Sequence, residues 1–312
     1  MLEAQIIVGD AAKSLAKVEA GSVRTCVTSP PYWGLRDYGD AGQLGQEATP
    51  QEFVENLCQV FDEVRRVLAD DGTVWVNLGD SYNGAAPNRS GANGFNDGRT
   101  NRDKRFSVGG VQGLKPKDLV GIPWRFAFAM QDRGWYLRQD IIWAKPNPMP
   151  ESVTDRCTKS HEYVFLFSKQ PRYFFDHKAI QEPAIHSNDR RAGKGRIQYD
   201  GKRQGKEGTG QEAFVSIKEF RNKRSVWNVG VARYEGAHFA VYPPALIEPC
   251  IKAGSAEGDT VLDPFSGSGT TGAVALQNGR HYVGCELNPD YAALSEKRIS
   301  DAIGMFGKVE VC

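Results

Sequence analysis

The stretch "GDTVLDPFSGSGTTGAVALQNGRHYVGCELNPDYAALSEKRI", residues 258–299, decides the fold. It predicts a strand, a glycine-rich turn, a helix, a second strand and a second helix, because short apolar runs alternate with segments of helical spacing. The same alternation starts at "QIIVGD" (5–10) and continues through the first half of the chain. The sequence therefore predicts an α/β domain in which a mainly parallel sheet has helices on both faces.

The turn in this stretch, "DPFSGSGTTG" (263–272, the glycine turn), contains Gly267-x-Gly269-x-x-Gly272, and Glu286 ends the next predicted strand. Glycines at this spacing let a ligand approach the backbone, and an acid so placed accepts hydrogen bonds from ribose hydroxyls. No Gly-Lys-Ser/Thr follows, which excludes a P-loop. The turn predicts a nucleoside cofactor and leaves NAD and S-adenosylmethionine both open. Neighbours that suit the sulfonium and amino-acid tail of the latter are Asp263, Thr270 and Thr271.

A second unusual stretch, "TSPPYW" (28–33), follows the β-branched run "SVRTCV" (22–27). Proline cannot extend a strand ladder, so the two prolines end the strand and hold a stiff corner. This corner presents the hydroxyl of Ser29 and the rings of Tyr32 and Trp33. A plain turn explains the stretch equally well when it is taken alone.

The clearest helix spans residues 49–72, with Thr49 as N-cap, Pro50 in the first turn and Gly72 at its end. Apolar residues recur at helical spacing along it and are predicted to face a core. Further strands are predicted at 23–28, 73–80, 135–146 and 161–170, and further helices at 123–134 and 242–254.

The composition is that of an ordinary globular protein, with 40% hydrophobic and 25% charged residues. No apolar run is long enough to cross a bilayer and the N-terminus has no secretory signal, so we expect a cytoplasmic protein with no membrane partner. The six cysteines contain no CxxC pair. We therefore expect free, buried thiols and no metal site.

The net charge of +1 conceals two basic segments. Residues 187–225 contain eleven Lys and Arg against five Asp and Glu, and residues 83–118 contain seven against three. Solvated loops explain such segments on composition alone. However, long loops in a compact domain are usually functional or disordered, and clustered positive charge indicates a polyanionic partner.

A series of motifs resembles the β group of the amino-methylating DNA methyltransferases. In chain order they are "TSPPYW", "GTVWVNLGD", "IIWAKPNPMP", "SHEYVFLFSK", "HFAVYPPALIEPCIKAGS", "DPFSGSGTTG" and "GCELNPDY". The resemblance covers most of the chain apart from the basic segments. It implies a class I S-adenosylmethionine-dependent methyltransferase fold, circularly permuted, with a seven-stranded, mainly parallel sheet and a basic, loop-rich target-recognition insertion. The strand carrying Asp263 would then lie beside the strand that leads into Ser29.

The resemblance also implies a division of the chain. Residues 1–175 would form the catalytic half of the methyltransferase domain and include a flexible basic insertion at 83–118. Residues 176–236 would form the target-recognition region. Residues 237–312 would form the cofactor-binding half of the same domain.

S-adenosyl-L-methionine is the implied cofactor. The residues implied to bind it are Asp10, Asp263, Phe265, Gly267, Gly269, Thr270, Thr271, Glu286 and Asn288. The residues implied to be catalytic form the SPPY corner: Ser29, Pro30, Pro31 and Tyr32. The basic residues implied to contact DNA are Arg190, Arg191, Lys194, Arg196, Lys202, Arg203 and Lys206.

The implied reaction moves a methyl group to the exocyclic N4 amine of a cytosine flipped out of double-stranded DNA. The Ser29 hydroxyl and the Pro30 carbonyl would accept hydrogen bonds from the amine, and Tyr32 would stack on the base. SPPY is typical of cytosine-N4 members, whereas adenine-N6 members more often carry Asp first, so adenine N6 is the alternative. A nucleotide-dependent oxidoreductase is a remote alternative. The resemblance leaves open a homodimer and a cognate restriction endonuclease.

Overall fold

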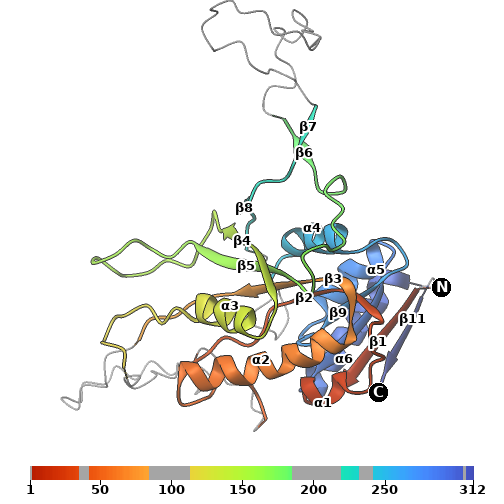
Figure 1. The fold of residues 1–312 in the computed structure, drawn as a ribbon, viewed down its shortest axis with the longest axis horizontal. Helices are drawn as coiled ribbons and strands as arrows, with labels where there is room; N and C mark the ends of the chain where they lie inside the picture. The colour runs from red at the N-terminus through yellow and green to blue at the C-terminus, as the bar shows by residue number, and fades with distance from the viewer. Residues whose placement is uncertain (1, 35–41, 84–112, 185–218, 232–241, 305–306) are drawn as a thin grey trace, which may run out of the picture.

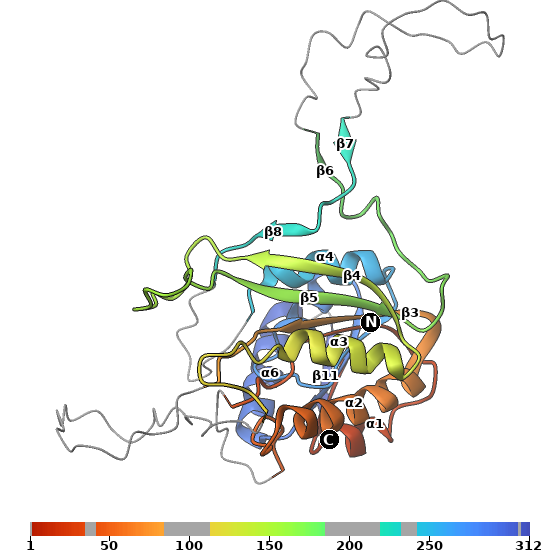
Figure 2. The same cartoon turned by 60° about the vertical axis from the view of Figure 1, so that its left-hand side comes forward.

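The computed structural model describes residues 2–34, 42–83, 113–184, 219–231, 242–304 and 307–312. A nine-stranded sheet forms its centre (Figures 1 and 2). In spatial order the strands are β11 (Gly307–Val311), β1 (Leu2–Val8), β10 (His281–Glu286), β9 (Thr260–Asp263), β2 (Val23–Thr28), β3 (Leu68–Leu78), β5 (His161–Ser168), β4 (Tyr136–Ala144) and β8 (Val226–Asn228).

The five strands from β1 to β3 in this order are parallel, so their carboxyl ends meet at one edge of the sheet. Strand β5 is antiparallel to both β3 and β4. In the pairing of β2 with β9, Cys26 lies opposite Leu262. The strand carrying Asp263 therefore lies beside the strand that leads into Ser29, as predicted, although the two come from opposite ends of the chain.

The prediction of seven strands is wrong, because the sheet has two further edge strands. Strand β11 pairs with β1, and β8 pairs with β4. Both carry a weak sequence signal: β8 has only three residues, and the alternation in β11 ("GKVEV") is short and half polar. A strand at the edge of a sheet needs little apolar surface. The other seven strands correspond to the seven predicted.

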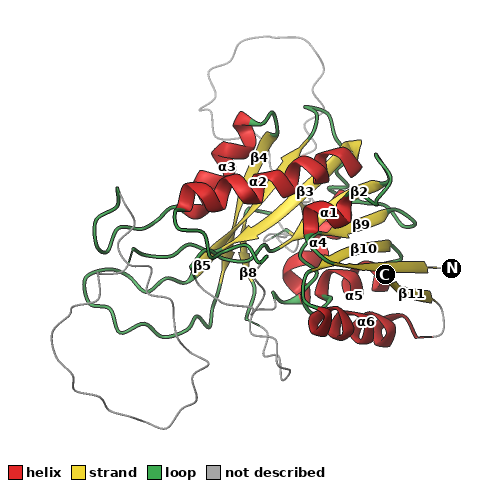
Figure 3. Cartoon of the chain, turned by 90° about the horizontal axis from the view of Figure 1, so that it is seen from below, coloured by secondary structure: helices red, strands yellow, loops and turns green. Residues whose placement is uncertain are grey.

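Helices cover both faces of the sheet, as predicted (Figure 3). On one face lie α1 (Ala11–Leu15), α2 (Pro50–Val67) and α3 (Ile122–Asp132). On the other lie α4 (Pro244–Gly254), α5 (Thr270–Gln277) and α6 (Pro289–Ile303). Each layer has its own apolar core, so the sheet is buried on both sides along its middle strands.

Helix α2 begins as predicted and ends earlier than predicted. The Thr49 hydroxyl accepts the N–H of Glu52 at 3.1 Å, and the Glu52 carboxylate accepts the N–H of Thr49, which is a capping box. The helix ends at Val67, and β3 starts at the next residue. Gly72 lies in β3, where a Cβ atom would be 2.8 Å from the carbonyl oxygen of Arg24. This glycine therefore serves the close approach of β2 and β3.

A short ribbon of β6 (Glu182–Pro183) and β7 (Phe220–Arg221) stands apart from the main sheet (Figures 1 and 2). The carboxylate of Glu182 accepts hydrogen bonds from the guanidinium groups of Arg221 and Arg224, each at 2.9 Å. These ion pairs hold the two chain segments together at the base of the ribbon.

Most of both basic segments lies outside the described residues. No described helix is long and apolar enough to cross a membrane. All six cysteines are free, as expected. Cys157 and Cys312 are exposed rather than buried, because one lies in the connection between β4 and β5 and the other follows β11.

We predict that Gly254→Ala destabilises the fold. A Cβ atom at this position would lie 2.5 Å from Thr25 Oγ1 and 2.7 Å from Thr73 Oγ1, two buried hydroxyls that hydrogen-bond each other. Overpacking of this kind should lower the free energy of unfolding by about 1–3 kcal/mol in urea denaturation. Gly230→Ala, whose Cβ would have an ordinary 3.5 Å contact, is the control and should change it by less than about 1 kcal/mol. Equal losses in both variants would contradict the prediction.

Candidate active site

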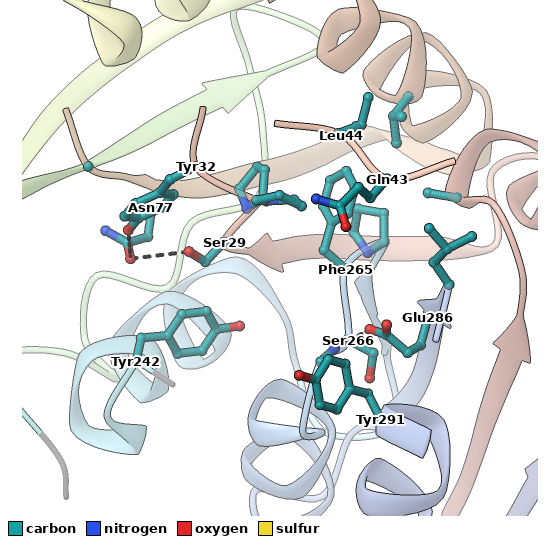
Figure 4. A pocket seen from close by; sticks show the side chains of 18 of the residues that line it. Ser29, Tyr32, Gln43, Leu44, Asn77, Tyr242, Phe265, Ser266, Glu286 and Tyr291 are labelled. Atoms are coloured by element: carbon teal, nitrogen blue, oxygen red, sulfur yellow. Dashed lines mark hydrogen bonds between the residues drawn. The ribbon is translucent and has the colours of Figure 1, made fainter. Parts of the chain in front are cut away.

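A cavity of about 1180 Å³ lies along the carboxyl ends of the parallel strands (Figure 4). Ligands of open α/β sheets bind at this edge. The predicted site residues in its wall are Asp10, Ser29, Pro30, Pro31, Tyr32, Phe265, Gly267, Thr270, Glu286 and Asn288. The structure therefore brings the SPPY corner and the glycine turn to one cavity.

The glycine turn follows β9 and leads into α5. Gly267 and Gly269 have φ angles of +52° and +76°, in the left-handed region that favours glycine. A Cβ atom on Gly269 would also lie 2.9 Å from the Cα atom of Ser295 in α6. Gly269 is thus required for helix packing and lies outside the cavity wall, whereas Gly267 is part of that wall.

Glu286, at the end of β10, is fixed across the turn. Its Oε2 accepts the N–H of Gly267 at 2.7 Å, and its Oε1 accepts the N–H of Asn288 at 3.0 Å. Burial raises the pKa of Glu286, and these N–H groups oppose the rise. Each oxygen keeps a further lone pair, so the carboxylate can accept hydrogen bonds from a ligand in the cavity.

The cavity wall fits the nucleoside part of the predicted cofactor. The carboxylates of Glu286 and Asp10 can accept hydrogen bonds from hydroxyl and amino groups, and Phe265 and Leu287 add apolar surface. Asp10 also caps α1 by accepting the N–H of Lys13 at 3.1 Å. Neither carboxylate forms an ion pair with a Lys or Arg of the described residues, and Lys13 lines the same end of the cavity.

Asp263 and Thr271, both predicted to bind the cofactor, lie beneath the cavity and not in its wall. The Asp263 carboxylate is 1% exposed. It accepts hydrogen bonds from the hydroxyls of Thr28 (2.6 Å), Thr271 (2.7 Å) and Tyr242 (3.1 Å), and from the N–H of Phe265 (3.0 Å). Burial raises its pKa, and the four donors oppose the rise. These donors occupy both carboxylate oxygens, so Asp263 acts on the site by holding β2 and β9 together.

The hydroxyl groups of the SPPY corner meet at Asn77 in β3 (Figure 4). Ser29 Oγ donates to Asn77 Oδ1 at 3.5 Å, the outer limit of a hydrogen bond. Tyr32 Oη lies 3.2 Å from the same oxygen and donates to Glu162 Oε2 at 2.6 Å. Asn77 Nδ2 donates to the carbonyl of Tyr163 at 3.1 Å, which fixes the orientation of the amide. The Ser29 hydroxyl thus has Asn77 as its neighbour behind the cavity wall, and its oxygen can accept a hydrogen bond from a ligand in the cavity.

Lys145 and Glu162 complete this network. Lys145 forms an ion pair with Glu162, and its Nζ atom lies 4.2 Å from the ring centroid of Trp143. A Cβ atom on Gly79 would lie 2.6 Å from the ring of Tyr32, so this glycine makes room for the ring. The predictions missed Asn77, although a polar residue inside the apolar strand "VWVNL" was a signal for it.

Two residues beside the corner have structural roles. The Asp80 carboxylate accepts the N–H groups of Gly121 and Ile122 and thereby caps α3. Trp33 is 3% exposed, and its Nε1 donates to the carbonyl of Glu47 at 3.0 Å. Trp33 is therefore a core residue and not part of the cavity wall.

The predicted DNA-contacting residues all lie in 185–218, outside the described residues: Arg190, Arg191, Lys194, Arg196, Lys202, Arg203 and Lys206. Within the described ranges, no group of three His, Cys, Asp or Glu side chains could hold a metal ion.

Comparison with known proteins assigns the family. The sequence model of a DNA methylase family, that of the N6 and N4 methyltransferases, matches residues 23–297. The chain belongs to this family. It is 48% identical to the type II methyltransferase M.XycI of Xanthomonas campestris pv. cyanopsidis over 93% of this chain and 86% of that protein. It is 46% identical to M.Cfr9I of Citrobacter freundii over 95% of this chain and 87% of that protein. The predicted resemblance is confirmed.

Solved structures support the fold. The PvuII DNA methyltransferase (cytosine-N4-specific) has a TM-score of 0.63 and 19% identity, and the match covers 99% of this chain and 94% of that one. A putative DNA modification methylase of Thermus thermophilus, complexed with S-adenosyl-L-methionine, has a TM-score of 0.60 and 23% identity over 99% of both chains. At these identities the likeness shows the α/β fold of DNA methylases.

We predict that Glu286→Gln changes the pH dependence of stability. The raised pKa of Glu286 means that the folded protein without ligand keeps a proton that the unfolded chain, with a pKa of about 4.3, releases. This carboxyl therefore lowers the free energy of unfolding as the pH rises from about 4.3 through the raised pKa. The free energy of unfolding of Glu286→Gln, minus that of the wild type, should increase over this pH range in urea denaturation. A difference that stays constant with pH would contradict the raised pKa.

Proposed function

We propose that the chain is a type II DNA methyltransferase that methylates the N4 amine of cytosine. One observation carries this proposal: the SPPY corner and the glycine turn line a single cavity at neighbouring strand ends. The corner offers hydrogen-bond acceptors suited to an amine, and the turn offers a carboxylate suited to a nucleoside. The family assignment supplies the DNA substrate and the methyl-transfer reaction.

S-adenosyl-L-methionine is the cofactor, as predicted. It supplies an electrophilic methyl group on a positively charged sulfur. Among the described residues, Glu286, Asp10 and Phe265 are the ones we assign to holding its adenosine. This assignment is based on the family and on the two carboxylates and the aromatic ring that these residues place in the cavity wall.

The chain's own residues would prepare the amine for attack. The amine lone pair is delocalised into the base, and acceptors placed around its hydrogens favour a geometry that localises this lone pair. The Ser29 oxygen and the Pro30 carbonyl are such acceptors in the cavity wall, and the ring of Tyr32 offers a stacking surface for the flipped base. Most of the acceleration then comes from holding the reacting atoms in line.

The contact of Ser29 with Asn77 indicates whether Ser29 can remove a proton from the amine. The nitrogen gains a methyl group and must lose one proton. Ser29 is hydrogen-bonded to Asn77, and a carboxamide accepts no proton at neutral pH. Ser29 therefore orients the amine and does not deprotonate it, and the proton passes to water after the methyl group has been transferred.

Cytosine is favoured over adenine because Ser29 occupies the first position of the SPPY corner. A serine there is typical of the cytosine-N4 members of the family, whereas aspartate is more frequent among adenine-N6 members. Adenine N6 is the alternative within the same chemistry. The oxidoreductase reading gives the SPPY corner no role, and the family assignment speaks against it.

The proposed organisation follows the predicted division of the chain. Residues 1–175 and 237–312 build the catalytic and cofactor-binding parts of one permuted domain, and residues 176–236 recognise the DNA target. The similarity to type II methyltransferases supports the further proposal that this activity belongs to a restriction–modification system with a cognate endonuclease.

Nucleoside analysis tests the reaction directly. Double-stranded DNA is incubated with the protein and S-adenosyl-L-methionine carrying an isotopically labelled methyl group, digested to nucleosides and analysed by mass spectrometry. We expect the label in N4-methyldeoxycytidine. Label in N6-methyldeoxyadenosine would overturn the cytosine assignment but keep the amino-methyltransferase, and absence of labelled nucleosides would overturn both.

Substitutions at the corner test the mechanism. Ser29→Ala should lower kcat for methyl transfer by roughly 10²–10³-fold, the usual loss on removing a preorganised polar group from an active site, and leave cofactor affinity unchanged. Tyr32→Phe keeps the stacking ring and should lose less activity than Tyr32→Ala. Ser22→Ala is the matched control and should retain full activity. Ser22 directly precedes β2, and its hydroxyl donates a hydrogen bond to the carbonyl of Glu19, away from the cavity wall. Full activity of Ser29→Ala would overturn the proposed mechanism.

A further inference from the structure

The connection between β4 and β5, residues 145–160, projects beyond the ends of these strands (Figures 1 and 2). It carries Met149, whose side chain is 82% exposed and is the most exposed large hydrophobic residue of the described chain. Among the exposed large hydrophobic residues of the described ranges, Met149 and Val231 are the two that line the cavity. Met149 and Val231 therefore form an apolar lip, that is, an exposed apolar part of the rim of the cavity that contains the SPPY corner.

The chain around Met149 is held on both sides. Asn147 Oδ1 accepts the N–H of Val231 at 3.0 Å, which ties one side of the lip to the other. On the opposite side, Glu151 accepts the N–H of Lys159 at 3.0 Å and pairs with Arg156 at 2.7 Å.

The sequence adds stiffness at the tip itself. Pro148 and Pro150 flank Met149 and restrict the backbone on either side of it. Exposure of Met149 is therefore a consequence of a braced loop that presents this side chain to solvent beside the cavity.

Extraction of a base leaves a gap in the DNA stack next to the protein. Proteins that bend DNA insert apolar side chains between base steps, and methionine is among those used, so such a side chain can occupy space within the base stack. Methionine is also unbranched and polarisable, so it adapts to a gap of irregular shape. A flipped base in the cavity places the vacated gap on the rim side of the site, where Met149 stands.

We propose that Met149 enters the duplex when the target base leaves it and takes the place of that base in the stack. This proposal rests on the proposed function, since it requires a flipped base. Met149 would then act on the extraction of the base and not on methyl transfer itself. A variant lacking this side chain should be impaired in proportion to how strongly the target base is held in the duplex.

The test compares two duplexes that differ only in the partner of the target base, at a position first mapped as methylated by the wild type. In one the target is correctly paired, and in the other it is mispaired and cheaper to extract. Met149→Ala should lose roughly tenfold or more in kcat/KM on the paired duplex and less than about threefold on the mispaired one. Met149→Leu, which keeps an apolar side chain of similar volume, should remain near the wild type on both.

Phe128→Ala, an exposed aromatic residue of α3 outside the cavity wall, is the matched control and should leave the ratio of the two activities unchanged. Thermal unfolding of Met149→Ala should match the wild type because Met149 is 82% exposed. Phe128→Ala loses a ring contact with Trp124, so activities are compared below the unfolding temperature of each variant. Equal losses of Met149→Ala on the two duplexes, or none on the paired duplex, would overturn the inference. If the initial mapping finds no base of double-stranded DNA that the wild type methylates, the proposed function is overturned instead.

Discussion

The carboxylate of Asp263 joins the two strands on which both halves of the site depend. Thr28, at the end of β2, donates to it at 2.6 Å, and the N–H of Phe265 in the glycine turn donates at 3.0 Å. A buried carboxylate is costly unless it is fully hydrogen-bonded, which is why its pKa is raised and why four donors surround it. Because Thr28 directly precedes Ser29, this interaction fixes where the SPPY corner stands relative to the turn.

The corner depends in turn on a polar residue in the middle of an apolar strand. Asn77 is 4% exposed, and such a group is tolerated only where its donors and acceptors are paired. Its amide donates to the carbonyl of Tyr163 and to Glu162, so its oxygen faces Ser29. The choice of amide over carboxylate at this point has a chemical consequence: the group that contacts the Ser29 hydroxyl is not a base, and the carboxylate of the network, Glu162, is paired with Lys145.

Much of the fold follows from local pattern, and the remainder depends on contacts that local pattern does not contain. The strand–turn–helix at the glycine turn and the capping box of α2 are local, and both were predicted. The end of α2 was misplaced because Leu68 continues the helical apolar spacing. Its side chain is buried as the first residue of β3, just as it would be in a longer helix, so its burial does not show where the helix ends. Strands β8 and β11 were missed because each is short and finds its partner only in the folded sheet.

The same division applies to the site. The wall residues of the SPPY corner and of the turn were predicted from motifs that follow strands, because the ends of parallel strands converge. The buried role of Asp263 was not predicted, since a motif gives residue types and not the direction of each side chain. Asn77 was missed for a related reason: its function arises from β2 lying beside β3, and no spacing in the sequence encodes that pairing.

The carboxylates of the cavity wall are paired differently at its two ends. At the corner, Glu162 is paired with Lys145 and adds no net charge. At the turn, Glu286 and Asp10 have only N–H partners among the described residues, and Lys13 lies in the same wall. Under the proposed function, these carboxylates would attract the positively charged sulfur of the cofactor, and the corner would suit a neutral base. A cation there also favours the ionised form of Glu286, which burial opposes. The product of methyl transfer would have a neutral sulfur, so the same carboxylates would hold the cofactor more strongly than its product.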